Sequence, residues 1–147
     1  MADKLTSNSP ISLVDVAELS SATAEFDFVV GESEQRAFAS ISGDFNPLHL
    51  DPEFARDRGL AGAVVYGAMI IAQISRIIGM NLPGSAGIWS ALKIDFREPL
   101  YVGEAAHIFA EVAHYSEAAH SLSLKIKVTS AERTVATASA LATLHSS

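Results

Sequence analysis

Apolar and polar residues alternate along several segments of the chain with the period of a β-strand. Residues 25–30 alternate and then become apolar, which predicts a first strand that ends at Gly31. Four later segments also have strand character: 87–97, 106–114 and 122–128 alternate, and 134–144 is a run of small and β-branched residues. In the first of these four, we expect Ile88, Leu92, Ile94 and Phe96 to face inward. Because short turns join the later strands, they predict an antiparallel meander.

Between the first strand and the later ones, the spacing of apolar residues changes to three and four, as in helices. Residues 33–42 form one predicted helix, which Glu32 or Ser33 can cap. Residues from about 65 to 79 form a longer helix that is apolar on almost every side, which is typical of a helix buried on most sides. In a chain this small, only a sheet could bury it so fully. We therefore predict an α+β fold in which an antiparallel sheet wraps around a long central helix.

Composition and length define the class of protein. The chain has 147 residues, 49% of them hydrophobic and 18% charged, as expected for a folded globular domain. We expect a polar N-terminal leader over residues 1–21 and a single domain over residues 22–147. The net charge of -7 argues against a nucleic-acid surface. Without cysteine, the chain has no disulfide framework, thiolate nucleophile or cysteine zinc site.

Neither a membrane span nor a metal site is expected from the sequence. The most apolar window, residues 61–80, contains Gln73, Ser75 and Arg76, which favours a buried core helix. The polar first residues contain no signal-peptide core, so we expect a cytoplasmic protein. Four histidines lie outside residues 42–52, and their spacing does not match that of metal ligands: His107, His114, His120 and His145.

A stretch dense in polar groups, residues 42–52, follows the first predicted helix. Asp44 and His49 lie roughly 140° apart at about 100° per helical residue, so they cannot share a helix face. Pro47 would also break an interior helical turn and restricts the loop backbone. If the two side chains converge, they do so through a stiff loop in which a carboxylate and an imidazole can share a water. The alternative is structural: Asp44 and Asn46 cap a turn, and His49 is a surface histidine.

Three segments of the chain, residues 38–52, 64–69 and 96–104, resemble the MaoC-like branch of the hot-dog superfamily, in particular the single-domain (R)-specific enoyl-CoA hydratases. The resemblance covers roughly residues 26–144. It implies a hot-dog homodimer with the active site at the subunit interface and an acyl pocket beside the long helix. A coenzyme A thioester is the implied substrate, with no metal or redox cofactor.

The resemblance also implies roles for individual residues. Asp44 and His49 would hold the water that adds to the 2-enoyl thioester, and Gly67 would present its backbone N–H to the thioester carbonyl. Counting along the long helix assigns Ser75 to the site, although a packing role for this serine is also open. Tyr66 stands where the family usually has histidine, and it either contacts the site or fills core space. Asn46 is a further substrate-binding candidate, although we interpret Asn46 and Asp51 mainly as residues that hold the loop's shape.

The activity that the resemblance implies is the reversible hydration of trans-2-enoyl-CoA to (R)-3-hydroxyacyl-CoA. Such a reaction needs a base for the water, a donor for the developing enolate and a proton for C2, which these residue types can supply. One alternative is a 3-hydroxyacyl thioester dehydratase that acts on an acyl-carrier-protein thioester, or on a branched or polar acyl group. A thioesterase and a non-catalytic module that binds acyl thioesters are the others.

Overall fold

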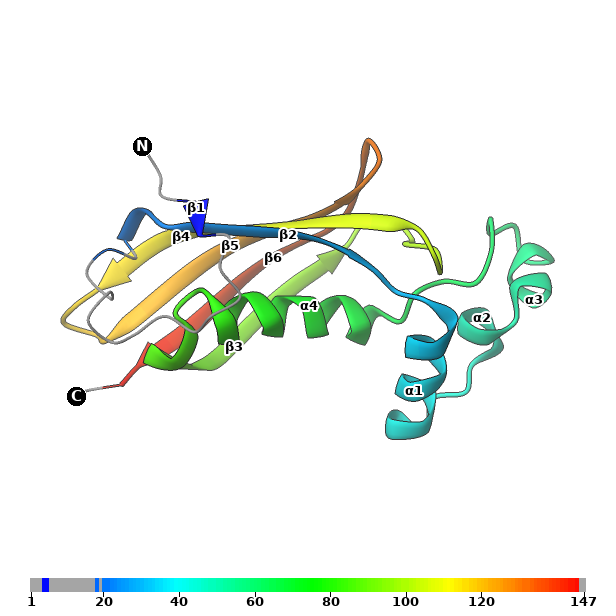
Figure 1. Cartoon of the computed structure of the whole chain (residues 1–147), viewed down its shortest axis with the longest axis horizontal. Coiled ribbons are helices and arrows are strands. Elements are labelled where there is room, and N and C mark those ends of the chain that lie inside the picture. Colours follow the sequence, from blue (N-terminus) through cyan, green and yellow to red (C-terminus); the bar gives the residue numbers. More distant parts are fainter. Residues whose placement is uncertain (1–3, 6–17, 19, 146–147) are drawn as a thin grey trace.

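The computed structural model describes residues 4–5, 18 and 20–145 and consists of one sheet with a long helix along one face (Figure 1). The strands are β1 (Lys4–Leu5), β2 (Thr23–Val29), β3 (Gly87–Phe96), β4 (Ala105–Ser116), β5 (Ser121–Ser130) and β6 (Arg133–Leu144). The helices are α1 (Glu32–Ser42), α2 (Pro47–Leu50), α3 (Pro52–Arg56), the long α4 (Gly67–Met80) and the short 3-10 helix η2 (Gly84–Ala86). The predicted α+β class is confirmed.

The six strands are ordered β1-β2-β4-β5-β6-β3, and every neighbouring pair is antiparallel except β1 with β2. Strands β4, β5 and β6 form the predicted meander. Strand β3 does not pair with β4, the next strand in the chain, but with β6, where Ile94 lies opposite Ala138. Strand β2 pairs with β4, where Phe26 lies opposite Ile108. Strands β2 and β3 therefore lie on opposite sides of the sheet, with the meander β4-β5-β6 between them.

The core lies between α4 and the face of the sheet that α4 covers. Alternate residues of the central strands are fully buried there, as for Ile108 on β4 and Leu124 on β5. They meet one stripe of α4, formed by Ile70, Ile74, Ile77 and Ile78. Burying a side chain of this size stabilises the fold by about 1.5–3 kcal/mol. This packing fixes α4, and with it the position of the helix's first residues.

Two details of α4 differ from the sequence-based expectation. The helix begins at Gly67 rather than near residue 65, because Tyr66, at φ -53° and ψ 132°, has a non-helical backbone and serves as the N-cap. The opposite side of the helix is exposed in the single chain, at Ala68, Ala72, Ser75 and Gly79. The sheet covers only one side of the helix, and the exposed residues on the other side are small or weakly polar. The chain itself therefore buries less of the helix than the apolar sequence predicted.

Strand β3 also departs from the expected alternation. Leu92 and Ile94 pack against the core as predicted, but Ile88 and Phe96 are 61% and 52% exposed. A register shift between Trp89 and Ala91 interrupts the pairing with β6, and an extra residue of this kind reverses which face the preceding side chains occupy. The expectation was therefore wrong for Ile88. Phe96 follows the register shift, shares the face of Leu92 and Ile94, and lies against Gly67 at the start of α4, where it is only partly covered.

Helices α1, α2 and α3 lie together beyond one end of the sheet (Figure 1). The N-cap of α1 is Gly31 rather than Glu32 or Ser33, and the Glu34 carboxylate accepts a hydrogen bond from the Gly31 N–H at 3.1 Å. Pro47 begins the one-turn helix α2, because the first helical position needs no N–H donor.

The predicted cap of the next helix is confirmed. Asp51 Oδ1 accepts from the backbone N–H groups of Glu53 and Phe54, at 3.0 and 3.2 Å. Pro52 is the first residue of α3, as the sequence predicts. Asp51 therefore acts as the residue that joins α2 to α3.

The predicted leader, residues 1–21, lies mostly outside the described residues. Within it, Lys4–Leu5 pair with Thr23 and Ala24 at the edge of the sheet. The boundary between leader and domain stays a prediction. Among the residues that the structure describes, no helix has the length and apolar character needed to cross a membrane.

Candidate active site

The loop between α1 and α2 is held by a series of side chains that bond to backbone groups two residues ahead. Ser42 Oγ accepts from the Asp44 N–H at 3.1 Å, and Asp44 Oδ1 accepts from the Asn46 N–H at 3.1 Å. Asn46 Oδ1 in turn caps α2 by accepting from the Leu48 N–H at 3.0 Å. Gly43, at φ 77°, adopts the left-handed conformation that ends α1. Asn46 therefore shapes the loop, as interpreted from the sequence, while a substrate contact by Asn46 stays a prediction.

His49 is half-buried on α2, and one of its ring nitrogens is already bonded. Its Nδ1 lies 2.7 Å from the backbone oxygen of Val64. A carbonyl oxygen can only accept a hydrogen bond, so we assign the proton to Nδ1. In the neutral imidazole this leaves Nε2 as an acceptor for a water or a substrate hydroxyl.

Tyr66 contacts both of the predicted catalytic residues. Its ring stacks on the His49 ring with centroids 4.0 Å apart and planes inclined by 28°. Its hydroxyl donates to the backbone oxygen of Asp44 at 2.5 Å. Burial, followed by the negative charge of Asp44, raises the pKa of Tyr66 above its ordinary value, so the hydroxyl remains a donor at neutral pH. The structure thus brings Asp44, His49 and Tyr66 together.

Gln35 is a site residue that the sequence analysis did not find. This side chain is 1% exposed and lies on α1, facing the start of α4. Its Nε2 donates to the backbone oxygens of His49 and Val64 at 2.9 and 3.0 Å, and its Oε1 accepts from the Tyr66 N–H at 3.1 Å. One signal was available: Gln35 lies four residues before Ala39, on the buried stripe of α1. A polar residue on such a stripe indicates a buried hydrogen-bonding role.

Gly67 and His49 open on one hollow of about 400 Å³, the helix hollow, which lies between the start of α4 and the end of β3. Among the described residues, no group accepts a hydrogen bond from the Gly67 N–H. A Cβ at this position would lie 2.9 Å from Cζ of Phe96. The lining residues are His49, Val64, Val65, Gly67, Ile70, Phe96, Arg97, Glu98, Pro99 and Leu100. The hollow is therefore mainly apolar, with an imidazole and a backbone donor in its wall.

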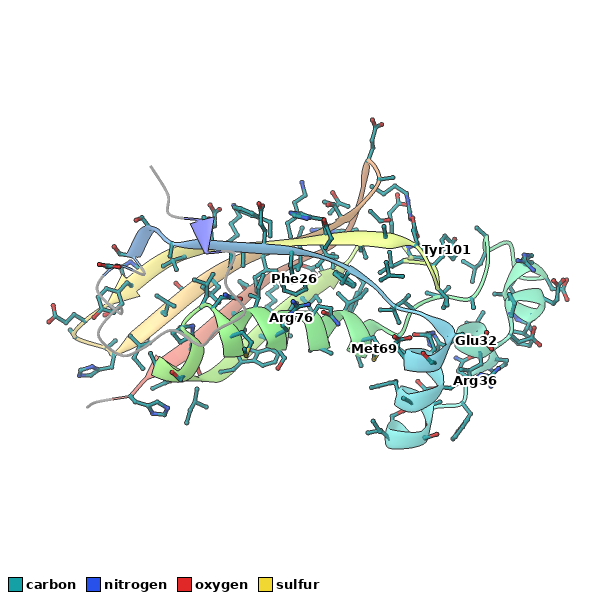
Figure 2. All side chains as sticks on the ribbon, viewed as in Figure 1. Phe26, Glu32, Arg36, Met69, Arg76 and Tyr101 are labelled. Carbon is teal, nitrogen blue, oxygen red and sulfur yellow. The ribbon has the colours of Figure 1, made fainter. Side chains whose placement is uncertain are left out.

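A second hollow of about 590 Å³, the arginine hollow, also includes His49 in its wall. Figure 2 shows Glu32 and Arg36 next to each other on α1, where the two side chains form an ion pair at 2.8 Å. Arg56 is paired in the same way with Glu53, at 2.5 Å. The lining residues are Glu32, Gln35, Arg36, His49, Leu50, Asp51, Pro52, Arg56, Ala61, Gly62, Ala63, Tyr101 and Val102. Both arginines in the wall of the arginine hollow therefore already form ion pairs with carboxylates of their own helices.

Ser75 lies apart from this group. It is exposed on α4, and the eight residues from Gly67 correspond to about 12 Å along the helix. It lines neither of the two hollows that contain His49. A role for Ser75 in the site stays a prediction. In the described part of the chain, no group of three or more His, Cys, Asp or Glu side chains is placed to hold a metal ion.

An antiparallel sheet packed on one long helix, with a polar loop beside the helix's first residue, defines the hot-dog class of α+β proteins. The profile of the MaoC like domain family matches residues 14–136, which is most of the chain. The chain therefore belongs to the MaoC-like domain family, as the sequence motifs predicted.

Individual relatives and solved structures agree with this assignment. An (R)-specific enoyl-CoA hydratase of Aeromonas caviae is 37% identical over 87 residues, which cover 59% of this chain and 65% of that protein. A mitochondrial 3-hydroxyacyl-[acyl-carrier-protein] dehydratase of Arabidopsis thaliana is 36% identical over 76 residues, or 52% of this chain and 45% of that protein. The matched segments thus span less than two thirds of these relatives.

The solved structure of the (R)-hydratase from A. caviae involved in PHA biosynthesis superimposes with a TM-score of 0.80 at 30% identity. That superposition covers 84% of this chain and 94% of the hydratase. R-hydratase PhaJ1 from Pseudomonas aeruginosa superimposes with a TM-score of 0.82 at 26% identity, covering 95% of this chain and 88% of PhaJ1. The similarity in structure therefore extends well beyond the segments matched by sequence.

Proposed function

We propose that the protein reversibly hydrates trans-2-enoyl-CoA to (R)-3-hydroxyacyl-CoA, with the attacking water held between Asp44 and His49. The observation that supports this proposal is that His49, with its free Nε2, and Gly67, with its unbonded N–H, line one hollow, while Tyr66 joins His49 to the Asp44 loop. Asp44 itself lines neither hollow that contains His49. These are an acid–base pair and an oxyanion donor, the groups that addition of water to a conjugated thioester requires.

The proposed reaction adds the two parts of one water across the double bond. Asp44 takes a proton from the water while His49 Nε2 orients it, and the hydroxyl bonds to C3. Negative charge then develops on the thioester oxygen, where the Gly67 N–H at the start of α4 stabilises it. The proton taken from the water returns to C2, so the atoms balance without a net change of charge. Because no electrons leave the substrate and a backbone donor polarises the carbonyl, we propose no metal or redox cofactor.

The helix hollow supports an acyl chain as the group bound beside α4. Val65, Ile70 and Leu100 give its wall an apolar surface next to Gly67. An apolar cavity with a few polar groups at one end is typical of sites for small organic ligands. We therefore place the acyl chain in the helix hollow, with the reacting carbons near His49.

A second candidate is the dehydration of 3-hydroxyacyl groups on an acyl-carrier protein. The similarity to the Arabidopsis thaliana dehydratase favours it. The same residues would run the reaction in the opposite direction, so the carrier and the acyl group, and not the catalytic groups, distinguish the two candidates. A branched or polar acyl group is part of this alternative.

We also propose that the protein acts as a homodimer. Strand β3 is the last strand of the sheet, pairs within the described chain only with β6, and exposes Ile88 and Phe96. A long edge strand with exposed apolar side chains is a surface that proteins normally cover.

A cytoplasmic location stays a prediction, which fractionation of cells that produce the protein would test.

One assay tests the activity. Purified protein is incubated with crotonyl-CoA, with a longer enoyl-CoA and with the matching acyl-carrier-protein thioesters, while loss of the conjugated double bond and release of free thiol are followed separately. We expect loss of the double bond without thiol release, and an (R)-3-hydroxyacyl product by chiral chromatography. Thiol release would instead identify a thioesterase. Binding without turnover of any thioester would identify a non-catalytic module.

A further inference from the structure

Tyr66 is the one described side chain whose contacts join the two predicted catalytic residues directly. Its hydroxyl bonds the main chain of Asp44, 22 residues earlier in the chain, and its ring lies on His49. Phe38 of α1 contacts the same ring, with centroids 4.6 Å apart. The ring of Tyr66 is therefore fixed by two aromatic neighbours, and its hydroxyl is directed at one backbone atom.

The backbone of Tyr66 is fixed as firmly as its side chain. The Tyr66 N–H donates to Gln35 Oε1, and the other end of the Gln35 amide bonds the backbone oxygens of His49 and Val64. Val64 is also the residue whose carbonyl sets the tautomer of His49. Asp44, His49 and the first turn of α4 thus belong to one hydrogen-bonded network around Tyr66.

We propose that Tyr66 is a positioning residue of the active site, whose hydroxyl and ring hold Asp44 and His49 in the mutual orientation that the hydration step needs. The proposal rests on the proposed function for its catalytic consequence. It assigns Tyr66 neither a substrate contact nor a proton-transfer role, because its hydroxyl is already donated to the protein. A residue that merely filled core space would not need this bond, since phenylalanine would fill nearly the same volume.

The chemistry of tyrosine has a consequence that histidine at this position would not have. A phenol is neutral across the range in which enzymes usually work, so its bond to the Asp44 carbonyl is the same at every such pH. An imidazole changes charge near neutrality. In this protein the bond that orients the Asp44 loop is therefore independent of pH in the neutral range.

The test compares Tyr66→Phe, which removes only the hydroxyl, with Tyr115→Phe, which removes a hydroxyl from half-buried Tyr115 on β4. For Tyr66→Phe we expect kcat to fall about five- to tenfold with KM nearly unchanged, the effect of losing one hydrogen bond that orients a reacting group. We also expect lower backbone order parameters, from ¹⁵N relaxation, for the amides of residues 44–46. Tyr115→Phe will keep wild-type values in both measurements.

A second variant, Tyr66→His, replaces the pH-independent donor with a titrating one. We expect the pH profile of kcat/KM to gain one transition between about pH 5 and 8 beyond those that the wild type and Tyr66→Phe share. An unchanged profile would contradict the pH-independence that we assign to the tyrosine.

The two measurements on Tyr66→Phe separate this proposal from the proposed function. A fall in kcat without a loosened loop, or a loosened loop with wild-type kcat, would overturn the positioning role. If the wild type turns over no thioester, the proposed function fails, and the order parameters alone then decide whether Tyr66 holds the Asp44 loop.

Discussion

At the scale of single residues, each predicted catalytic side chain uses one atom to shape the site and leaves another atom for chemistry. Asp44 Oδ1 accepts from the Asn46 N–H, while no described group bonds Asp44 Oδ2. His49 Nδ1 donates to Val64, which leaves Nε2. Because the structural bond and the reactive atom are separate, a substitution can remove the chemistry and keep the shape.

The Asp44→Asn variant makes use of this separation. Asparagine keeps an Oδ1 that can accept from the Asn46 N–H, so the loop will retain its conformation, but it cannot act as a base. We expect turnover of enoyl-CoA to fall by about 10²- to 10⁴-fold, with an unchanged circular dichroism spectrum and unfolding temperature.

Asp95→Asn is the matched control for that measurement. Asp95 is an exposed carboxylate on β3, and no described hydrogen bond joins it to Asp44, His49 or Tyr66. This variant will keep wild-type turnover. Near-normal turnover in Asp44→Asn would reject the proposed role of Asp44 as the base.

The raised pKa of Tyr66 predicts a loss of stability in alkali. As the pH rises above the ordinary tyrosine value of about 10, the unfolded chain releases a proton that folded Tyr66 keeps, so stability falls through the folded pKa. The free energy of unfolding in urea, measured at about pH 9 and about pH 11, will therefore decrease less in Tyr66→Phe than in the wild type. An equal decrease would show that the other groups titrating in this range account for the whole effect.

Some of these residue roles could be predicted from the sequence and others could not, for a physical reason. Asp51 was predicted because an N-cap and the N–H groups it bonds are two and three residues apart. The hydrogen bonds of Gln35 and Tyr66 join residues up to 31 positions apart in the sequence. A local sequence pattern cannot predict which distant residues will be in contact. The resemblance to the family supplied the remaining candidates, Asp44, His49 and Gly67. The chemistry of the loop alone did not decide between a catalytic and a structural role for Asp44 and His49.

At the scale of secondary structure, the periodic patterns located every long element to within about two residues of its ends. They did not predict that β3 would pair with β6, because strand pairing depends on contacts between distant segments. They also placed Ile88 on the wrong face, since the bulge in β3 has no local sequence signal. In α4, the pattern gave the length of the helix but not which side the sheet would cover.

The first turn of α4 supplies a prediction at this scale, through Gly67→Ala. The added methyl would lie 2.9 Å from the ring of Phe96, in the wall of the helix hollow. Because that ring is half exposed and can move, and alanine favours the helix, the free energy of unfolding will change by no more than about 1 kcal/mol. We expect kcat/KM to fall about tenfold, because the methyl crowds the thioester carbonyl.

Gly79→Ala is the control for the same helix, because a Cβ there would meet nothing within 4 Å. It will stabilise the protein by up to about 1 kcal/mol and leave the activity unchanged. A parallel loss of activity in both variants would show that the hollow beside Gly67 has no special part in binding.

At the scale of the whole molecule, the free edge strand β3 is the surface through which we propose that two chains associate. We expect sedimentation to give twice the 15.5 kDa mass of one chain, and Ile88→Asp on β3 to shift the protein toward the single chain. Val29→Asp is the control, since Val29 is 55% exposed on β2, near the other side of the sheet. A single-chain mass for the wild type, or no shift for Ile88→Asp, would contradict a dimer formed through β3.

Helices α1, α2 and α3 and the loop between them are joined to the rest of the molecule by few bonds. These are the bonds of Gln35 to Val64 and Tyr66, the His49–Val64 and Tyr66–Asp44 bonds, and the bond from the Val64 N–H to the Leu48 oxygen at 3.0 Å. The strands of the sheet bond along most of their length. Segments with few such attachments open at lower free energy than the core, so heat will disable the site before it melts the sheet. We expect activity to be lost at a lower temperature than the circular dichroism signal of the strands. A bound thioester will reduce the difference between the two transition temperatures. Coincident transitions would instead mean that the three helices and the sheet unfold as one unit.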